Sequence, residues 1–332
     1  MIENSEELKA HYADGFPDDS PGFTDFFFDR FAADSNNVLT YRENGRLISA
    51  GYIVEKRARL FGRERTFPYM TALSTVSGER GKNKIVNVLR GGFYRLRKSG
   101  YAYFGLYPFS YDYYKRFSFA DISFAKKSVV AGGEAAERRD ITAATATKRD
   151  IESMARICAA MESRFDNSLI CGEKRARERL DEYSVDGTPC SVLSLNGVDF
   201  AFAYVENGHL DYYACHSTGV FARAEPFKGL TYYDFDAPEA PYLQGRIVDA
   251  ERALLDYPYA PNLDYGATVK IADPMIEEND AAFAIKIKGG AVSLKRVQSA
   301  DSVVGIDVLT ARMFLGGGGI FSASKNFFCD NY

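Results

Sequence analysis

Residues 72–119 read ALSTVSGERGKNKIVNVLRGGFYRLRKSGYAYFGLYPFSYDYYKRFSF, and this stretch decides the fold. It begins with strand-like alternation, passes a short basic loop, and continues with apolar residues at steps of three and four, which is the pattern of a helix packed on a sheet. Gly100 follows as the end of the helix, and another strand starts at Tyr101. The stretch therefore predicts the succession strand, basic loop, helix, strand. The apolar residues of the helical stripe are Ile85, Val88, Leu89, Phe93 and Leu96.

The segment before the basic loop predicts an antiparallel meander. Residues 38–76 contain three strand-like runs, separated by Asn44-Gly45 and Phe61-Gly62. Glycine and asparagine accept the positive φ that a tight hairpin requires. We therefore expect the first third of the chain to form a sheet on which the helix packs.

The middle third repeats this order. A helix-like segment at 150–165 precedes a second meander at 190–217, whose turns are Asn196-Gly197 and Asn207-Gly208. The similarity indicates a tandem duplication. Residues 218–245 contain prolines and aromatic residues where a glycine-rich loop and a long helix would follow, so we expect the second copy to be shortened.

The pattern changes again from about Arg246. Residues 246–259 and 306–317 have helical patterns, and residues 283–297 alternate apolar and basic side chains about a Gly289-Gly290 turn. This combination predicts a third domain of the α+β class.

Composition narrows the classes of function. The chain has 332 residues, of which 46% are hydrophobic and 26% charged, as in ordinary globular proteins. A net charge of −4 and a pI of about 5.6 provide no global field for polyanions, so nucleic acid is not an expected partner. The polar, acidic N-terminus does not have the pattern of a signal peptide, and no run of about 20 apolar residues is present. We expect a cytoplasmic protein without a membrane partner.

Cysteine and histidine usage argues against several kinds of site. The five cysteines are widely spaced without a CxxC pair, so neither a disulfide framework nor a zinc site is predicted, and we expect buried thiols. Three scattered histidines, with no GxSxG or HExxH, argue against hydrolase and zinc-enzyme classes. Asp234 and Asp236 lie in a proline-flanked loop and are interpreted as solvated acids, so no metal is assigned.

The basic loop allows two interpretations. A loop between a strand and a helix N-terminus offers unpaired N–H groups and a positive dipole end, and Arg80, Lys82 and Lys84 add charge, so the loop suits a pyrophosphate. A solvated basic turn explains the same residues. The aromatic residues of 101–119 are interpreted mainly as core.

Residues 69–119 resemble the core of the GNAT N-acetyltransferases, specifically the Eis-like (enhanced intracellular survival) branch. The C-terminal part is similar too, at GRIVDAERALLDYPY, VKIADPMIEENDAAFAIKI, IDVLTARMFLGG and a tail that ends NFFCDNY. The resemblance implies an α/β (α+β) fold with three parts. These are a mixed, twisted-sheet GNAT domain at 1–130, a shortened second GNAT-like unit at 131–240, and a sterol-carrier-protein-like (SCP2-like) α+β domain with the C-terminal tail at 241–332.

The resemblance also implies the cofactor site, for acetyl-CoA as cosubstrate. The family's strand before the loop presents backbone groups to the pantetheine arm and its loop binds the pyrophosphate. Asn83 and Ile85 occupy positions where the family has glycine or alanine. The matching residues here are Leu73, Ser74, Thr75 and Val76 in the strand, and Arg80, Gly81, Lys82, Asn83 and Lys84 in the loop.

The implied reaction is direct acetyl transfer to a primary amine in a ternary complex. The family's tyrosine motif matches residues 113–119, which makes Tyr114 the general acid, with Ser118 in place of the family's glycine. In Eis-like enzymes the terminal carboxylate takes the proton of the amine, and the corresponding group here belongs to Tyr332. Backbone N–H groups near Thr75 and Val76 would polarise the thioester carbonyl.

Other interpretations remain open at this point. The two replaced glycine positions also fit a binding protein whose cofactor groove has decayed, with a ligand or partner in the interdomain cleft or SCP2-like domain. A purely structural assembly protein is a third hypothesis. Asp18 and Asp19 are interpreted as solvated turn residues, although carboxylates near the acceptor entrance would favour a cationic amine. The resemblance implies a homo-oligomer and a small-molecule acceptor.

Overall fold

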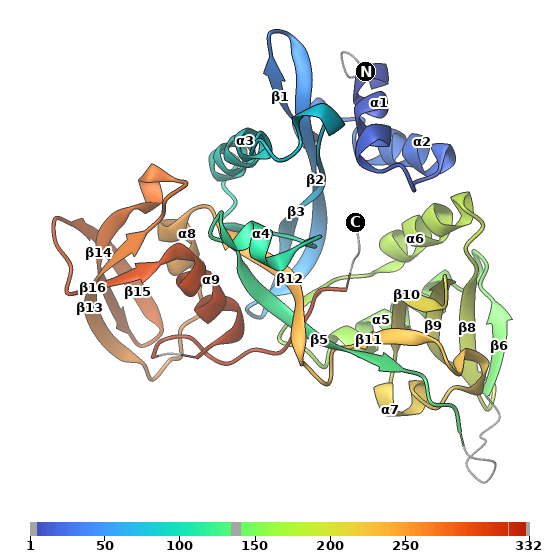
Figure 1. Cartoon of the computed structure of the whole chain (residues 1–332). Helices are drawn as coiled ribbons and strands as arrows, with labels where there is room; N and C mark the ends of the chain where they lie inside the picture. Colours follow the sequence, from blue (N-terminus) through green and yellow to red (C-terminus); the bar gives the residue numbers. More distant parts are fainter. Residues whose placement is uncertain (1–4, 134–140, 318, 330–332) are drawn as a thin grey trace.

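The first unit contributes strands β1 to β5 to a large mixed sheet. The computed structural model describes residues 5–133, 141–317 and 319–329. Figure 1 shows this unit in the centre of the molecule, in blue and blue-green. Its elements are α1 (Ser5–Gly15), α2 (Pro21–Arg30), β1 (Val38–Glu43), β2 (Arg46–Leu60), β3 (Arg63–Thr75), α3 (Ile85–Lys98), β4 (Tyr103–Leu106), α4 (Tyr111–Lys115) and β5 (Ala120–Val129).

The local predictions for this unit are confirmed. Asn44 and Phe61 have φ of 49° and 53°, each followed by a glycine with positive φ, so both hairpins turn in the left-handed region. The α3 helix buries the predicted apolar stripe against the sheet, and Gly100, with φ of 83°, ends it. The succession of strand, loop, helix and strand is therefore present.

The second unit has the same meander but a shorter helical half. After β10 the chain forms the four-residue α7 and a three-residue 3-10 helix, Glu225–Phe227, where the first unit has the 14-residue α3. The short helical half agrees with the expectation that the second unit is truncated. Its elements are β6 (Ile141–Thr145), α5 (Ile151–Glu162), β7 (Asn167–Leu169), α6 (Glu173–Val185), β8 (Cys190–Leu195), β9 (Val198–Glu206), β10 (His209–Cys215), α7 (Thr218–Phe221), β11 (Thr231–Asp234) and β12 (Ala240–Ile247).

The two units share one sheet, which has 13 strands in the described part of the chain. Strand β12 lies between β4 and β5 of the first unit and pairs antiparallel with both. The far half of β5 pairs with β11 of the second unit. The order is β17-β7-β2-β3-β4-β12-β5-β11-β10-β9-β8-β6, with β1 paired to β2. Residues 241–247, assigned from the sequence to the third domain, thus lie in this main sheet.

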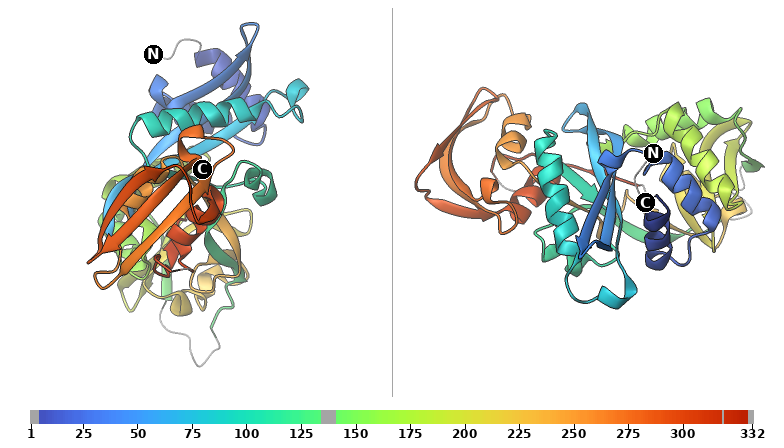
Figure 2. Two further views of the ribbon diagram at one scale, coloured as in Figure 1. Left: turned by 90° about the vertical axis from the view of Figure 1, so that its left-hand side faces the viewer. Right: turned by 90° about the horizontal axis from the view of Figure 1, so that it is seen from above.

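The C-terminal domain has a separate four-stranded sheet of order β15-β14-β13-β16. Figures 1 and 2 show this domain and the second unit on opposite sides of the first unit. The helix predicted from Arg246 begins only at Ala250, because Arg246 and Ile247 complete β12 and Asp249 caps the helix by accepting from the N–H of Arg252. The elements are α8 (Ala250–Asp256), β13 (Asp264–Ala272), β14 (Ala281–Lys288), β15 (Ala291–Val297), β16 (Ser302–Gly305), α9 (Ile306–Leu315) and β17 (Asn326–Phe327).

The cysteines and the C-terminal tail contribute to the core. All five cysteines are free and buried, as expected. The tail returns from the C-terminal domain to the main sheet, where β17 pairs parallel with β7. Within the described ranges, no helix is long and apolar enough to cross a membrane.

Candidate active site

The end of strand β3 lies open at the centre of the first unit. Strand β3 pairs with β4 at Tyr69 and Gly105, and β4 ends one residue later, whereas β3 continues to Thr75. The last part of β3 therefore extends beyond its neighbour on this edge. Because each residue of a strand carries an N–H and a C=O group, this edge offers backbone groups to a ligand.

A β-bulge reshapes the same part of β3. Ala50 and Tyr52 of β2 pair with Ser74 and Thr71, so two residues of β3 lie opposite one of β2. Ala72, within the bulge, has φ of 48°. Bulges re-aim side chains and are common beside active sites. A Cβ at Gly51, the residue opposite the bulge, would lie 2.5 Å from Cδ2 of Leu73, so a larger residue there would force the Leu73 side chain to move.

Two cavities lie along this strand end. The first, the aromatic cavity, has a volume of about 340 Å³ and contains Leu73 and Tyr114. The second, the loop cavity, has a volume of about 130 Å³ and contains Thr75 and Tyr113. The aromatic cavity is lined by Tyr12, Phe16, Asp19, Phe23, Phe27, Met70, Thr71, Ala72, Leu73, Leu106, Tyr107, Phe109 and Tyr114. The loop cavity is lined by Thr75, Glu79, Gly81, Asn83, Lys84, Ile85, Tyr113 and Arg116.

The loop keeps its turn without the family's glycines. Asn83 has φ of 58°, a conformation that glycine favours and asparagine tolerates better than other residues. Ile85 is the first residue of α3, and its side chain is buried in the core of the first unit. The loop cavity opens at the N-terminus of α3, where the helix dipole is positive, and the N–H groups of Val86 and Asn87 donate to the carbonyls of Asn83 and Lys84.

The basic side chains of the loop are paired with acids of the protein. Arg80 donates to the carbonyl of Thr75 at 3.0 Å and to that of Asp14 at 2.6 Å, so it ties the loop to the end of α1. Lys82 pairs with Glu79 at 3.0 Å, and Lys84 pairs with Glu43 at 2.5 Å. Of the three bases, Lys84 lines the loop cavity, whereas Arg80 and Lys82 do not. Arg116, which sequence reasoning did not select, lines it as well.

Tyr114 lies on α4 at the wall of the aromatic cavity. Its side chain is 4% exposed, and its ring packs against Phe109, Tyr113 and Phe119. Burial raises the pKa of the Tyr114 phenol above its ordinary value, because desolvation disfavours the phenolate. Tyr114 therefore remains protonated at neutral pH and can donate a proton.

The C-terminal tail approaches this region, although Tyr332 itself lies outside the described residues. Phe328 stacks on Phe67 of β3, and the Cys329 thiol lies 3.8 Å from the hydroxyl of Tyr242. The ring of Tyr242 lies 5.2 Å from that of Tyr107, which lines the aromatic cavity. The described part of the tail thus ends one side chain away from a residue of that cavity.

Sequence reasoning treated the acids between α1 and α2 as solvated, and the structure separates them. Asp18 is exposed, whereas Asp19 is half-buried and lines the aromatic cavity. The hydroxyl of Tyr12 donates to Asp19 at 2.7 Å. The sequence carries no periodic signal for a side chain in a turn, so the spacing of FPDDS does not distinguish the two acids.

In the second unit, a cavity of about 390 Å³ follows β10, and ion-paired side chains line it. Asp236 accepts a hydrogen bond from Thr218 and pairs with Arg164 at 2.9 Å and with Lys325 at 2.6 Å. The interpretation of Asp236 as a solvated loop acid is therefore wrong, because protein cations surround it. Through Thr218 these pairs contact α7, which follows β10 in the chain as the basic loop and α3 follow β3.

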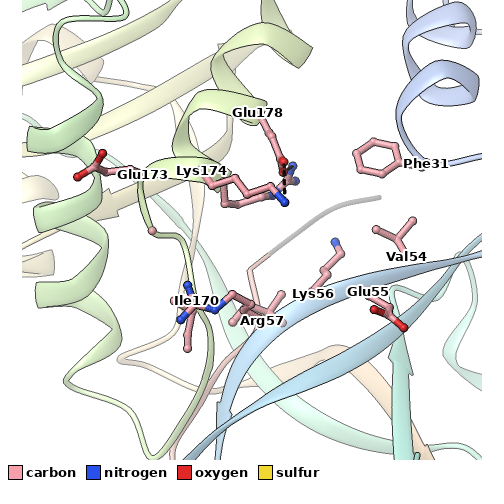
Figure 3. Close-up of a pocket in the computed structure, with 12 residues that line it drawn as sticks. Phe31, Val54, Glu55, Lys56, Arg57, Ile170, Glu173, Lys174 and Glu178 are labelled. Atoms are coloured by element: carbon pink, nitrogen blue, oxygen red, sulfur yellow. Dashed lines mark ion pairs between the residues drawn. The ribbon is translucent and has the colours of Figure 1, made fainter. Parts of the chain in front are cut away.

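A third cavity, of about 180 Å³, lies between β2 and α6 (Figure 3). Several of its charged groups contact one another or their neighbours. Glu178 pairs with Arg30 and lies 3.9 Å from Lys174, while Arg57 pairs with Glu64 at 2.6 Å. The Lys56 ammonium lies 4.0 Å from the centre of the Tyr69 ring. This cavity is a charged junction between the two units.

A buried polar network links the turn after Tyr114 to the C-terminal domain. Arg246 of β12 donates to the carbonyl of Ser118 at 2.9 Å and pairs with Asp273 at 2.5 Å, and both charged side chains are fully buried. Asp273 also accepts from the N–H groups of Met275 and Ile276. Burial lowers the pKa of Arg246, whereas Asp273 favours its charged form.

Comparisons with known proteins agree with this architecture. Residues 2–121 match the model of the acetyltransferase (GNAT) domain, and residues 250–323 match that of the sterol carrier protein domain. No curated protein matches the sequence.

Three solved structures share the fold over almost the whole chain. A GCN5-related N-acetyltransferase from Anabaena variabilis has a TM-score of 0.76 at 10% identity, covering 100% of this chain and 98% of that one. A probable N-acyltransferase from Enterococcus faecalis has a TM-score of 0.74 at 13% identity, and the match covers 98% of this chain and 97% of that one. Eis1 from Mycobacterium abscessus has a TM-score of 0.69 at 12% identity, and the match covers 100% of this chain and 99% of that one. The chain therefore contains an acetyltransferase (GNAT) domain and a C-terminal sterol carrier protein domain, and over almost its whole length it has the fold of these three structures.

Proposed function

We propose that this protein is an acetyl-CoA-dependent N-acetyltransferase that transfers the acetyl group directly to a primary amine in a ternary complex. The observation that carries the proposal is the open end of β3, which runs from the aromatic cavity with Tyr114 to the loop cavity at the N-terminus of α3. One end suits the reacting groups, and the other suits the phosphates of the cofactor.

The loop cavity supports binding of the pyrophosphate. An anion there would meet the positive dipole end of α3 and the cations of Lys84 and Arg116. The pantetheine arm would follow the backbone from Leu73 to Val76, which extends beyond the end of β4. Arg80 would act through the loop, because its guanidinium is held by α1 rather than directed into the cavity.

The chemistry assigned to Tyr114 is proton donation to the leaving thiolate. The neutral amine nitrogen attacks the thioester carbon, the carbon–sulfur bond breaks, and the sulfur takes the phenolic proton. The proton that the acylated nitrogen loses then restores the Tyr114 phenol. The backbone N–H group of Thr75 would stabilise the charge on the carbonyl oxygen, since the N–H group of Val76 already donates to the carbonyl of Ile48 at 2.9 Å. The products are the N-acetyl amine and CoA with a free thiol.

The proton of the amine requires an acceptor, and we assign it to the terminal carboxylate of Tyr332. The described tail ends at Cys329, beside Tyr242. Three further residues extend the chain by at most about 10 Å, since an extended residue spans about 3.3–3.6 Å. A carboxylate in apolar surroundings has a raised pKa, which improves it as a base near neutral pH.

If the Tyr332 carboxylate is the base, the rate of acetyl transfer should fall when the C-terminus is extended or shortened. A few residues added after Tyr332, or deletion of Asn331 and Tyr332, are expected to lower kcat by roughly 10²-fold or more, as for loss of a general base. Binding of CoA should be largely unchanged, because the loop cavity is not altered. Steady-state assays of a C-terminally extended and an N-terminally extended protein provide the comparison. Full activity of the C-terminally extended protein would contradict the assignment.

The single complete GNAT unit predicts one cofactor site per chain. Calorimetric titration with acetyl-CoA is expected to give a stoichiometry of one, because α7 has only four residues and Asp236 is already paired with protein cations. No heat and no thermal shift at millimolar acetyl-CoA would favour the binding-protein alternative over the enzyme. Two molecules per chain would show that the second unit retains a site.

A further inference from the structure

We infer that the acceptor is a primary monoamine with an aromatic or apolar body, whose ammonium group is recognised by Asp19. The inference rests on the proposed acetyl transfer and concerns the same site. In this inference the aromatic cavity accepts arylalkylamines and related apolar amines, and it disfavours polycations and amino acids.

The walls of the aromatic cavity define the body of the ligand. Aromatic rings come from α1 and α2 on one side and from the segment between β4 and α4 on the other, and aliphatic side chains of β3 and β4 lie between them. Tyr12 packs against Phe16 and Phe27 with ring centres 4.9 and 5.1 Å apart, so this wall is a continuous aromatic surface. Such surfaces favour flat or apolar groups and also attract cations to their faces.

Asp19 is the one formally charged residue among those that line the aromatic cavity in the described part of the chain. Tyr12 donates to its Oδ2 at 2.7 Å, which fixes the orientation of the carboxylate. Burial raises the pKa of the Tyr12 phenol, so Tyr12 remains a donor at neutral pH. Among the described residues, Oδ1 of Asp19 accepts no hydrogen bond, which leaves this atom for an ammonium group.

The charge count limits the acceptor class. One carboxylate can pair with one ammonium group, whereas a polycation would bury further charges against aromatic rings without partners. An amino acid would place its own carboxylate in a cavity whose lining contains no Lys or Arg. The volume of about 340 Å³ lies at the lower end of the range for ligand pockets and suits a small molecule.

Asp19 is therefore a binding and selecting residue in this account. It holds the amine in its ordinary ammonium form, and the proton leaves to the proposed base before the nitrogen attacks. Substitution of Asp19 should consequently raise KM for the amine without a comparable loss of kcat.

Matched amines test the class of acceptor. With saturating acetyl-CoA, 2-phenylethylamine and hexylamine are expected to have kcat/KM at least about tenfold above spermidine and phenylalanine, since one unpaired buried charge costs that much or more. Phenylalanine is the direct control for 2-phenylethylamine, because the two differ by one carboxylate. A preference for spermidine would overturn the inference while leaving acetyl transfer intact. No transfer to any amine would instead refute the proposed function.

The variants Asp19→Asn and Asp18→Asn test whether Asp19 binds the ammonium group. Asp19→Asn is expected to raise KM for 2-phenylethylamine by about tenfold or more, with kcat nearly unchanged, since a charge-assisted hydrogen bond is lost. Asp18 is exposed and lies outside the cavity, so Asp18→Asn should have the wild-type KM. An unchanged KM in Asp19→Asn, or a loss confined to kcat, would overturn the role of Asp19. Thermal unfolding of both variants confirms that they are folded.

Discussion

Replacement of Tyr114 by phenylalanine is expected to reduce kcat for acetyl transfer by roughly 10²–10⁴-fold, the usual contribution of a positioned general acid. The substitution removes the proton that the departing thiolate requires but keeps the ring that packs against Phe109 and Phe119. Affinity for acetyl-CoA should change little, because the loop cavity does not contain Tyr114. Steady-state kinetics with calorimetry separate the two quantities.

Tyr113→Phe is the matched control for this experiment. Tyr113 precedes Tyr114 on the same helix, but its side chain lines the loop cavity rather than the aromatic cavity. We expect this variant to retain kcat within a few-fold. Wild-type kcat in Tyr114→Phe would contradict the assignment, and a large loss in Tyr113→Phe alone would transfer the acid role to that residue.

The second large effect concerns stability. Asp273→Ala is expected to lower the free energy of unfolding by about 3–5 kcal/mol, because it leaves the charge of Arg246 buried without its partner. The substitution also removes the acceptor of two backbone N–H groups, at 2.9 and 3.1 Å. Whole domains have a stability of only about 5–15 kcal/mol, so the loss should be large in urea denaturation followed by circular dichroism.

An exposed pair provides the control for Asp273→Ala. Arg57 and Glu64 lie 2.6 Å apart, and their side chains are 67% and 64% exposed. Water screens such pairs, so Glu64→Ala is expected to cost less than about 1 kcal/mol. Similar denaturation midpoints for Asp273→Ala and Glu64→Ala would show that the buried network does not stabilise the junction with the C-terminal domain.

Local features of the fold could be predicted from the sequence because they depend on neighbouring residues. The left-handed turns at Asn44 and Asn196, the stripe of α3 and its end at Gly100 are all present. Each follows from backbone sterics or helical periodicity within about 15 residues. The shortened second unit was predictable for the same reason, since no helical stripe follows β10.

Long-range pairing could not be predicted in this way. Strand β12 crosses from the second half of the chain and lies between β4 and β5, and β17 pairs with β7 far from its neighbours in sequence. The alternation of a strand shows which face is buried but not which strand lies beside it. The sequence therefore predicted two similar units without showing that one sheet joins them.

The candidate site was predictable only in part. Resemblance selected Tyr114 and the loop, and the structure places Tyr114 and Leu73 around one cavity and Lys84 and Thr75 around the other. It also directs Arg80 toward Asp14, which spacing could not show because a long side chain can reach several neighbours. The structure added Arg116 and showed that Asp19, interpreted from the sequence as a solvated turn residue, lines the aromatic cavity. Both positions depend on packing of distant elements.

The most direct test of the account is whether the wild-type protein forms an N-acetyl amine. The protein is incubated with acetyl-CoA and 2-phenylethylamine, while free thiol and the mass of the amine are followed together. The account predicts that CoA thiol and N-acetyl-2-phenylethylamine appear in equal amounts, through many turnovers, and that Tyr114→Phe nearly abolishes both. Acetyl-CoA that binds but remains intact with every primary amine offered would contradict it and would identify a binding protein.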